Sequence, residues 1–273
     1  MGFDVAFGQY VEGRSLLHRM DPRYKIVATI LYIVVIFLAK SIWTFALLLL
    51  STLLLIAVSG IPLRILLRSM RPLLFIVLFT AAINIFWMKG DNLLVDWWIF
   101  EIYLEGIINA LLIVLRIVFL LLGTSVILTY TTTPIALTDG LEQLLAPLKK
   151  LHLPVHDFSM MMTIALRFIP TLIEETRKIM NAQKARGSDF SSGSLMQRTK
   201  ALLPILIPLF ISAFRRADEL ATAMECRCYA GGDGRSRMNV LHAGAKDVIF
   251  VLTLVALGVA FVLINRFVPG YSL

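Results

Sequence analysis

Residues 107–129 read IINALLIVLRIVFLLLGTSVILT, and this stretch decides the class of the fold. Arg116 is the only ionisable side chain that it contains. A helix needs about 20 predominantly apolar residues to cross roughly 30 Å of hydrocarbon at about 1.5 Å rise per residue. Residues 107–129 are therefore predicted to form a helix that spans a membrane.

The composition of the whole chain agrees with this prediction. Of its 273 residues, 58% are hydrophobic and 16% are charged, and the mean hydropathy is +0.82. A soluble domain carries about a quarter charged residues and somewhat under half apolar ones. The two cysteines are too few for a disulfide framework, which fits a reducing compartment. The composition indicates an integral membrane protein.

Four other stretches approach the length and apolar content of a spanning helix. They are residues 24–39, 42–59, 72–88 and 248–264. None of them alternates with the two-residue period of a barrel strand. We therefore expect an all-α integral membrane protein with about five transmembrane helices.

The distribution of basic residues predicts which way the chain crosses the membrane. Lys and Arg number 26 against 18 Asp and Glu, which gives a formal net charge of +8. With the N-terminus in the cytoplasm, two basic clusters fall on the cytoplasmic side: Arg14, Arg19, Arg23 and Lys25, and Arg64, Arg68 and Arg71. The positive-inside rule favours this orientation, and it assigns the excess positive charge to cytoplasmic loops and not to nucleic-acid binding.

The charge pattern also divides the chain. We predict a cytoplasmic N-terminal segment, a four-helix transmembrane region, a cytoplasmic region of long helices, and a last transmembrane helix with its tail. These parts comprise residues 1–23, 24–130, 131–246 and 247–273. The third part contains 15 of the 26 basic residues, between Lys149 and Lys246. It is therefore assigned to the cytoplasm.

Two long segments of the third part share one plan, and we call them the first arm (residues 158–185) and the second arm (residues 195–229). Each has an apolar first half and a charged second half. We expect each arm to be a helix that runs from the membrane toward the cytosol, with residues 188–194 as the turn between them.

Each arm ends in an arginine between two small residues. Ala185, Arg186 and Gly187 close the first arm, and Cys226, Arg227 and Cys228 lie near the end of the second. Arginine presents a rigid fork of donors to carboxylates and carbonyl groups. A basic residue is also favoured at any solvated helix C-terminus by the helix dipole, so one such motif admits that interpretation. The repetition favours two docking tips.

The sequence offers little for chemistry. It has no P-loop, and residues 231–234 are interpreted as a helix end. His152 and His156 are separated by Pro154, which disrupts a shared helical face. Cys226, Cys228 and His242 lack the spacing of a zinc site. No catalytic residue, metal or cofactor is predicted.

Arg116 is the one charged side chain in the middle of a predicted span, since Lys25 lies at the very start of residues 24–39. An ionisable group at that depth is costly, and a functional role is the default hypothesis. It could equally pair with a polar group on a neighbouring helix, such as Asn84 or Asn109, or snorkel to the interface. Both interpretations stay open.

Beyond these patterns, the chain resembles the transmembrane T component of energy-coupling-factor (ECF) transporters over nearly its whole length. The resemblance is carried by Gly8-Gln9-Tyr10, by Ser15 and Leu17-His18, by Asp21-Pro22-Arg23, and by the two arm tips. The family motif Ala-Arg-Gly is met at residues 185–187. Residues 226–228 depart from it, because two cysteines replace the alanine and the glycine.

The resemblance implies a membrane bundle with long cytoplasmic coupling helices and no catalytic activity of its own. Arg186 and Arg227 would dock two ABC ATPase subunits, and a membrane S component that binds a vitamin or a transition-metal ion would pack on the chain. It also implies a multi-pass protein of a prokaryotic cell membrane.

Two other classes of protein remain as alternatives. A membrane-embedded enzyme that acts on a lipid or isoprenoid substrate would need clustered acids, for which Asp139 with Glu142, or Glu174 with Glu175, are the candidates. A complete secondary transporter would need polar groups at the midplane of its spans, where Arg116 is the only charge.

Overall fold

The computed structural model describes residues 10–87, 93–97, 100–151, 154–188, 194–231 and 241–267. The chain forms two compact units. The bundle unit comprises Met1–Gln143 and Leu241–Leu273, and the arm unit comprises Leu144–Val240. Gly8, Gln9, His152, most of the predicted turn at 188–194 and Gly232–Gly234 lie outside the described residues.

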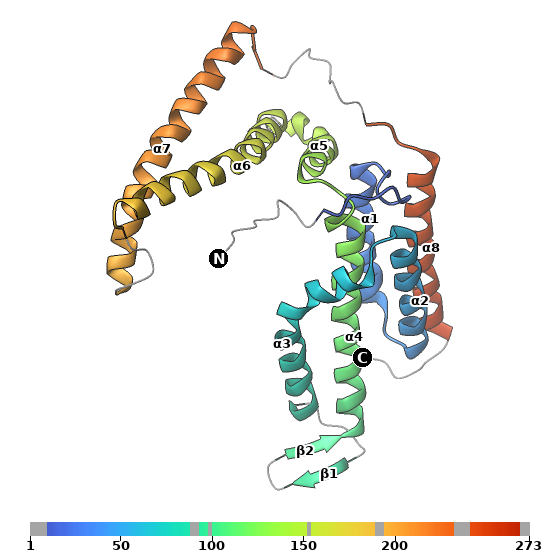
Figure 1. Ribbon diagram of the computed structural model, residues 1–273. Coiled ribbons are helices and arrows are strands. Elements are labelled where there is room, and N and C mark those ends of the chain that lie inside the picture. Colours follow the sequence, from blue (N-terminus) through green and yellow to red (C-terminus); the bar gives the residue numbers. More distant parts are fainter. Residues whose placement is uncertain are drawn as a thin grey trace. The chain divides into compact units, whose positions relative to one another are not determined.

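The bundle unit is built almost entirely of helices (Figure 1). Its elements are α1 (Pro22–Leu38), α2 (Ile42–Ser59), α3 (Leu63–Trp87), β1 (Leu93–Trp97), β2 (Phe100–Tyr103), α4 (Leu104–Thr124), a π-helix (Ser125–Thr129), α5 (Pro134–Leu144) and α8 (Ala245–Phe267). The two strands form one short antiparallel hairpin in which Trp97 pairs with Phe100.

Among the residues that the structure describes, four helical segments are long and apolar enough to cross a membrane: Ile42–Ser59, Leu63–Phe86, Leu104–Thr129 and Ala245–Phe267. The prediction of an all-α membrane protein is confirmed, and four of the five predicted spans are found. Helix α1 has 17 residues, which is the practical minimum for a span, and its membrane crossing stays a prediction.

Helix α3 begins earlier than the predicted span at residues 72–88. The helix runs through Pro72 and includes the three arginines at 64, 68 and 71. The sequence prediction took the proline and the charges as a boundary. A proline removes one backbone donor and bends a helix without always ending it, and α3 changes direction along its length (Figure 1).

Helix α1 lies at the centre of the bundle unit, packed against α8 and α4. Its Tyr32 is fully buried, and the hydroxyl is hydrogen bonded to Thr52 Oγ1 at 2.9 Å and donates to the Phe119 carbonyl at 3.3 Å. The tyrosine ring fits against Gly123 of α4, where a Cβ atom would collide with it. A glycine at this position permits the close approach of the two helices.

The arm unit contains a short 3-10 helix (Ala146–Leu151) and two long helices, α6 (Val155–Ala185) and α7 (Leu195–Cys226). At about 1.5 Å per residue, helices of 31 and 32 residues measure roughly 46 and 48 Å. The two predicted arms are therefore confirmed as single long helices.

Candidate functional site

The first arm tip is a capped helix end. Helix α6 stops at Ala185, and Arg186 occupies the C-cap position. The Gly187 N–H donates to the Lys184 carbonyl and the Ser188 N–H donates to the Gln183 carbonyl, both at 3.0 Å. This pair of bonds is a Schellman motif, which needs a left-handed residue after the cap, and Gly187 supplies it with φ +86°.

The second arm tip has the same geometry without a glycine. The Cys228 N–H donates to the Glu225 carbonyl at 2.8 Å, and the Tyr229 N–H donates to the Met224 carbonyl at 3.0 Å. Arg227 holds the position that Arg186 holds in the first tip. Cys228 adopts φ +55°, a left-handed conformation that costs a residue with a Cβ roughly 1–2 kcal/mol. The backbone of the motif is therefore kept where its sequence departs from the family pattern.

Both tips are open to solvent. All six of their residues are exposed: Ala185, Arg186, Gly187, Cys226, Arg227 and Cys228. Both cysteines are free thiols. Each tip thus presents one guanidinium fork on a backbone that is fixed by two capping bonds, with small neighbours that allow a partner's main chain to approach.

The two tips lie at opposite ends of an antiparallel helix pair. Glu175 of α6 contacts Ser212 and Arg216 of α7, whereas Gln183, further along α6, contacts Pro204, earlier in α7. The helices therefore run in opposite directions, and nearly the full length of α7 separates Arg227 from the end of α6. The expectation that both arms run the same way toward the cytosol is wrong, because the chain reverses between them.

Glu175 holds the helix pair together. One carboxylate oxygen accepts a hydrogen bond from Ser212 Oγ at 2.6 Å, and the other accepts from Arg216 Nη2 at 2.8 Å. The hydrogen bond from Ser212, together with the bond and charge of Arg216, lowers the pKa of Glu175. Both oxygens are occupied in this structural role, so Glu175 does not fit the general acid or base that the enzyme alternative requires.

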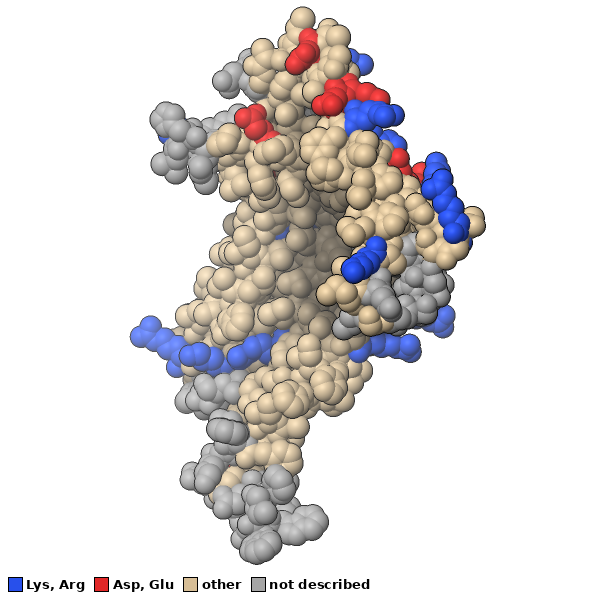
Figure 2. All heavy atoms as spheres, turned by 90° about the vertical axis from the view of Figure 1, so that its left-hand side faces the viewer, with Lys and Arg blue, Asp and Glu red and all other residues tan. Residues whose placement is uncertain are grey.

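Helix α7 also carries an exposed apolar face between the two tips. Its members are Leu202, Leu203, Leu206, Ile207, Phe210, Ile211 and Phe214, each of which is 47–65% exposed. Figure 2 shows broad uncharged areas on the face that it draws, with the charged side chains gathered in groups. Large exposed apolar patches mark surfaces that contact a protein or a membrane.

Two other candidates from the sequence were a functional Arg116 and a metal site. Arg116 donates from Nη2 to the Ala39 carbonyl at 2.7 Å and lies 5.6 Å from the Phe45 ring centroid, so it binds the end of α1 and not Asn84. Among the described residues, no three His, Cys, Asp or Glu side chains gather as a metal site.

A cavity of about 660 Å³ between α2 and α8 is lined mainly by apolar side chains.

The N-terminal signature forms a local network as far as the structure describes it. His18 is hydrogen bonded through Nδ1 to Ser15 Oγ at 2.6 Å and through Nε2 to the Val11 carbonyl at 2.9 Å. The Tyr10 ring meets the imidazole edge to face, and Leu17 is 1% exposed. The polar contacts fold the segment before α1 on itself, and Leu17 packs it against Ile56 and Tyr130 of the bundle unit.

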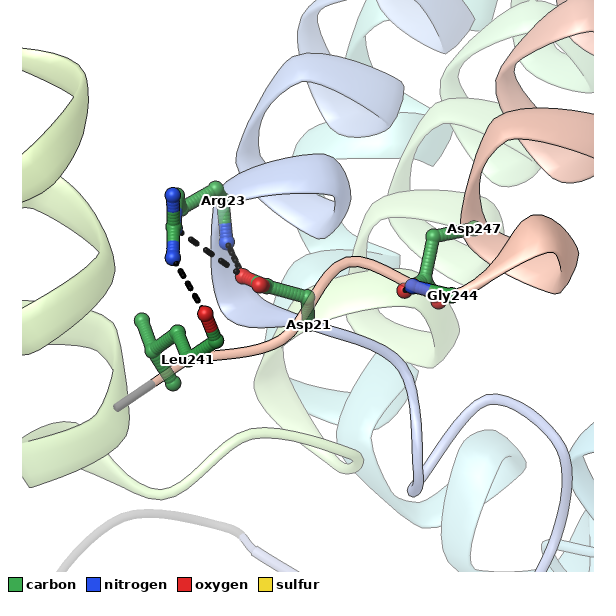
Figure 3. A network of polar contacts seen from close by, with 5 residues as sticks. All are labelled: Asp21, Arg23, Leu241, Gly244 and Asp247. Atoms are coloured by element: carbon green, nitrogen blue, oxygen red, sulfur yellow. Dashed lines mark hydrogen bonds and ion pairs between the residues drawn. The ribbon is translucent and has the colours of Figure 1, made fainter. Parts of the chain in front are cut away.

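Sequence reasoning missed the role of Asp21 and Arg23 at the start of α1 (Figure 3), and that of Lys25 one turn further on. Asp21 caps the helix by accepting from the Arg23 N–H at 2.9 Å, and Pro22 occupies the first turn, where no backbone donor is needed. Arg23 donates from Nη2 to the Leu241 carbonyl at 2.9 Å. The Asp-Pro-Arg signature carried the signal for this role. The charges of Arg23 and Lys25 served only to predict the orientation of the chain, and their hydrogen bonds to distant backbone were not predicted.

Replacing Cys228 with glycine is expected to stabilise the second tip by about 1 kcal/mol, because glycine adopts positive φ without a Cβ clash. The matched control is Cys226→Gly, which places glycine in the last helical turn and should have the opposite sign. Hydrogen exchange in the peptide that covers residues 224–229 measures both. Faster exchange in Cys228→Gly than in the parent would contradict the left-handed assignment.

Comparisons with known proteins were consistent with one another. A family model described as "Cobalt transport protein" (CbiQ) matches residues 13–240. A protein of Ruminiclostridium cellulolyticum named "Energy-coupling factor transporter transmembrane protein EcfT" is 54% identical over 246 residues, which cover 90% of this chain and 91% of that protein. Proteins of the same name from Clostridium kluyveri and Bacillus subtilis are 51% and 48% identical, over 93% of this chain and 93% and 95% of their own lengths.

Proposed function

The chain belongs to the CbiQ family of cobalt transport proteins, and on that premise we propose that it is the transmembrane energy-coupling subunit of an ECF-type ABC importer. In this role it carries out no catalysis. It transmits the ATP-driven motion of two ATPase subunits to a membrane S component that binds a vitamin or a transition-metal ion.

One observation carries the proposal: two exposed arginines sit on identical helix caps at opposite ends of one helix pair. Identical caps suit partners with the same kind of recognition surface. Because the end of α6 lies near the start of α7, most of the roughly 48 Å length of α7 separates the two arginines, which suits two partner subunits and not one. Arg186 and Arg227 are accordingly proposed as the ATPase-docking residues, each with its flanking pair of small residues.

The remaining surfaces are assigned from their chemistry. The apolar face of α7 is proposed to pack against the S component, because an S component is itself apolar and large apolar patches are contact surfaces. The bundle unit is proposed to anchor the complex in a prokaryotic cell membrane. The arm unit and the N-terminus are proposed to lie on the cytoplasmic side, where ATP is available. The basic clusters favour the same orientation by the positive-inside rule.

Purification of the tagged, full-length chain from its native membrane in mild detergent tests the proposal. We expect two ABC ATPase subunits and at least one small hydrophobic membrane protein in the purified complex, as identified by mass spectrometry. The purified chain alone is expected to turn over no lipid substrate and, in liposomes, to accumulate no solute under an ion gradient. Absence of ATPases from the complex, or activity of the isolated chain, would contradict the proposal.

A further inference from the structure

The chain leaves the bundle unit at the end of α5, after Gln143, and returns to it at Leu241. The segment that leads into α5, which we call the outgoing connection, and the returning segment are both bonded to the first turn of α1. On the outgoing side, Lys25 Nζ donates to the Thr131 carbonyl at 2.7 Å and to Thr132 Oγ1 at 3.2 Å. On the returning side, Arg23 Nη2 donates to the Leu241 carbonyl at 2.9 Å. We call Asp21, Arg23 and Lys25 the α1 clasp (Figure 3 shows its Asp21 and Arg23 side).

A steric contact adds to these bonds. Helix α5, which follows the outgoing segment, packs its Gly140 against Pro22, and a Cβ atom built on Gly140 would lie 2.9 Å from Pro22 Cβ. The returning segment is also held at its far end, where the Gly244 N–H donates to Asp247 Oδ2 at 2.8 Å in the first turn of α8. The clasp is therefore flanked on both sides by closely packed backbone.

The clasp contains buried charges, although it lies at the end of a helix. Lys25 is 1% exposed and Asp21 is 5% exposed, and the neighbouring Asp247 of α8 is 4% exposed. The buried Lys25 ammonium donates to the Thr131 carbonyl and to Thr132 Oγ1, which replace part of its hydration. Arg23 is ion-paired with Asp21 at 3.5 Å. Buried charge groups of this kind are weak contributors to stability but fix one geometry, since their partners must stay in place.

A π-helical turn lies next to the clasp. Helix α4 passes into the π-helix Ser125–Thr129 immediately before the segment that Lys25 holds, and the Tyr130 N–H donates to the Ser125 carbonyl at 2.9 Å. Short π-helical turns are rare and occur frequently at functional sites. The outgoing connection thus follows a helical turn that departs from the α-helical hydrogen-bond register and is then attached to Lys25.

We propose that the α1 clasp is the element through which displacement of the arm unit reaches the membrane bundle. Both connections end on one helix turn, and α1 contacts α8 and α4, so a pull on either connection acts on the centre of the bundle. Arg23 and Lys25 are positioning residues in this scheme, acting through the backbone of the two connections. The proposal rests on the proposed function, because it requires ATPases that move the arms.

The test uses the complete complex of the chain, its two ATPases and the S component. Deuterium uptake is recorded in peptides that cover residues 21–29 and 241–249, without nucleotide and with ATP plus vanadate. The wild-type complex is expected to show a nucleotide-dependent difference in both peptides. Arg23→Ala and Lys25→Met are expected to reduce that difference at least about fivefold, while the ATPases stay bound and hydrolyse ATP.

Two further variants separate transmission from structural support. Arg23→Lys keeps a cationic donor and should recover part of the difference. Arg64→Ala removes an exposed arginine from the start of α3 in the same unit and should leave the difference unchanged. Because Arg23 is partly exposed, we expect Arg23→Ala to fold, and this variant alone tests the clasp if Lys25→Met does not fold.

Three results would overturn the clasp proposal. The first is a wild-type complex with bound ATPases and no nucleotide-dependent difference in these peptides. The second is a difference of wild-type size in Arg23→Ala and in whatever folded Lys25→Met is obtained. The third is loss of ATPase binding in Arg23→Ala, which would assign the residue a structural role alone. A wild-type chain that binds no ATPase contradicts the proposed function instead, so the two failures are distinguishable.

Discussion

Replacing Arg186 and Arg227 together with glutamate is expected to release both ATPases from the detergent-solubilised complex. Each tip offers one exposed guanidinium as its anchor, and arginine anchors at protein interfaces contribute about 2 kcal/mol or more, which corresponds to roughly thirtyfold weaker binding on removal. Reversal of the charge adds repulsion from the acidic groups that an arginine site would offer. A pull-down on the tagged chain, with the retained ATPases quantified, measures the effect.

The single variants and a charge-matched control make this prediction specific. Because the tips lie at opposite ends of the helix pair, Arg186→Glu and Arg227→Glu should each weaken binding only in part. Arg215→Glu makes the same change at an exposed position within α7, away from either tip, and should retain both ATPases. Wild-type retention in the double variant would show that the ATPases dock elsewhere.

Replacing Gly123 with alanine is expected to lower the free energy of unfolding of the chain by about 2–3 kcal/mol. The added Cβ would collide with the Tyr32 ring, which is 0% exposed. The ring can move only by giving up its bonds to Thr52 and Phe119, so the penalty of overpacking is added to that of lost hydrogen bonds. The better helix propensity of alanine recovers only about 1 kcal/mol.

Thermal unfolding of the purified chain in detergent, followed by circular dichroism, measures this difference. Gly244→Ala is the matched control, since the atom nearest to a Cβ built there is Asp247 Oδ2 at 3.6 Å, an ordinary contact. The control should change the unfolding midpoint little. A Gly123→Ala protein as stable as the parent would show that α1 and α4 are not in the close contact described.

Features that depend on the local sequence were predictable. Continuous apolar runs identified the four helices in the described part of the chain that are long and apolar enough to span a membrane, because length and hydropathy define this property. The start of α3 was missed, since its arginines are excluded by hydropathy although they do not interrupt the helix. The β1–β2 hairpin was also missed, because strands of five and four residues leave almost no periodic signal.

The candidate site was only partly predictable, for physical reasons. Both tip motifs were located in the sequence as triplets. The left-handed conformation of Cys228 was not, because a residue with a Cβ atom disfavours positive φ and adopts it here only as part of the helix cap. The antiparallel arrangement could have been inferred. Residues 188–194 can reach at most about 25 Å when fully extended, so the second arm must start near the end of the first. The buried environment of Lys25 arises from contacts 106 and 107 residues distant, which a count of charges does not detect.

The chain contains two cysteines, and both lie in the second tip, exposed and on either side of Arg227. A thiol-directed reagent such as a maleimide can therefore mark one end of the helix pair in the unaltered protein and leave the other end untouched. Alkylation rates then become a gauge of occupancy at that end alone. The order in which the two proposed ATPase subunits join the complex can be followed in this way without introducing any foreign label site.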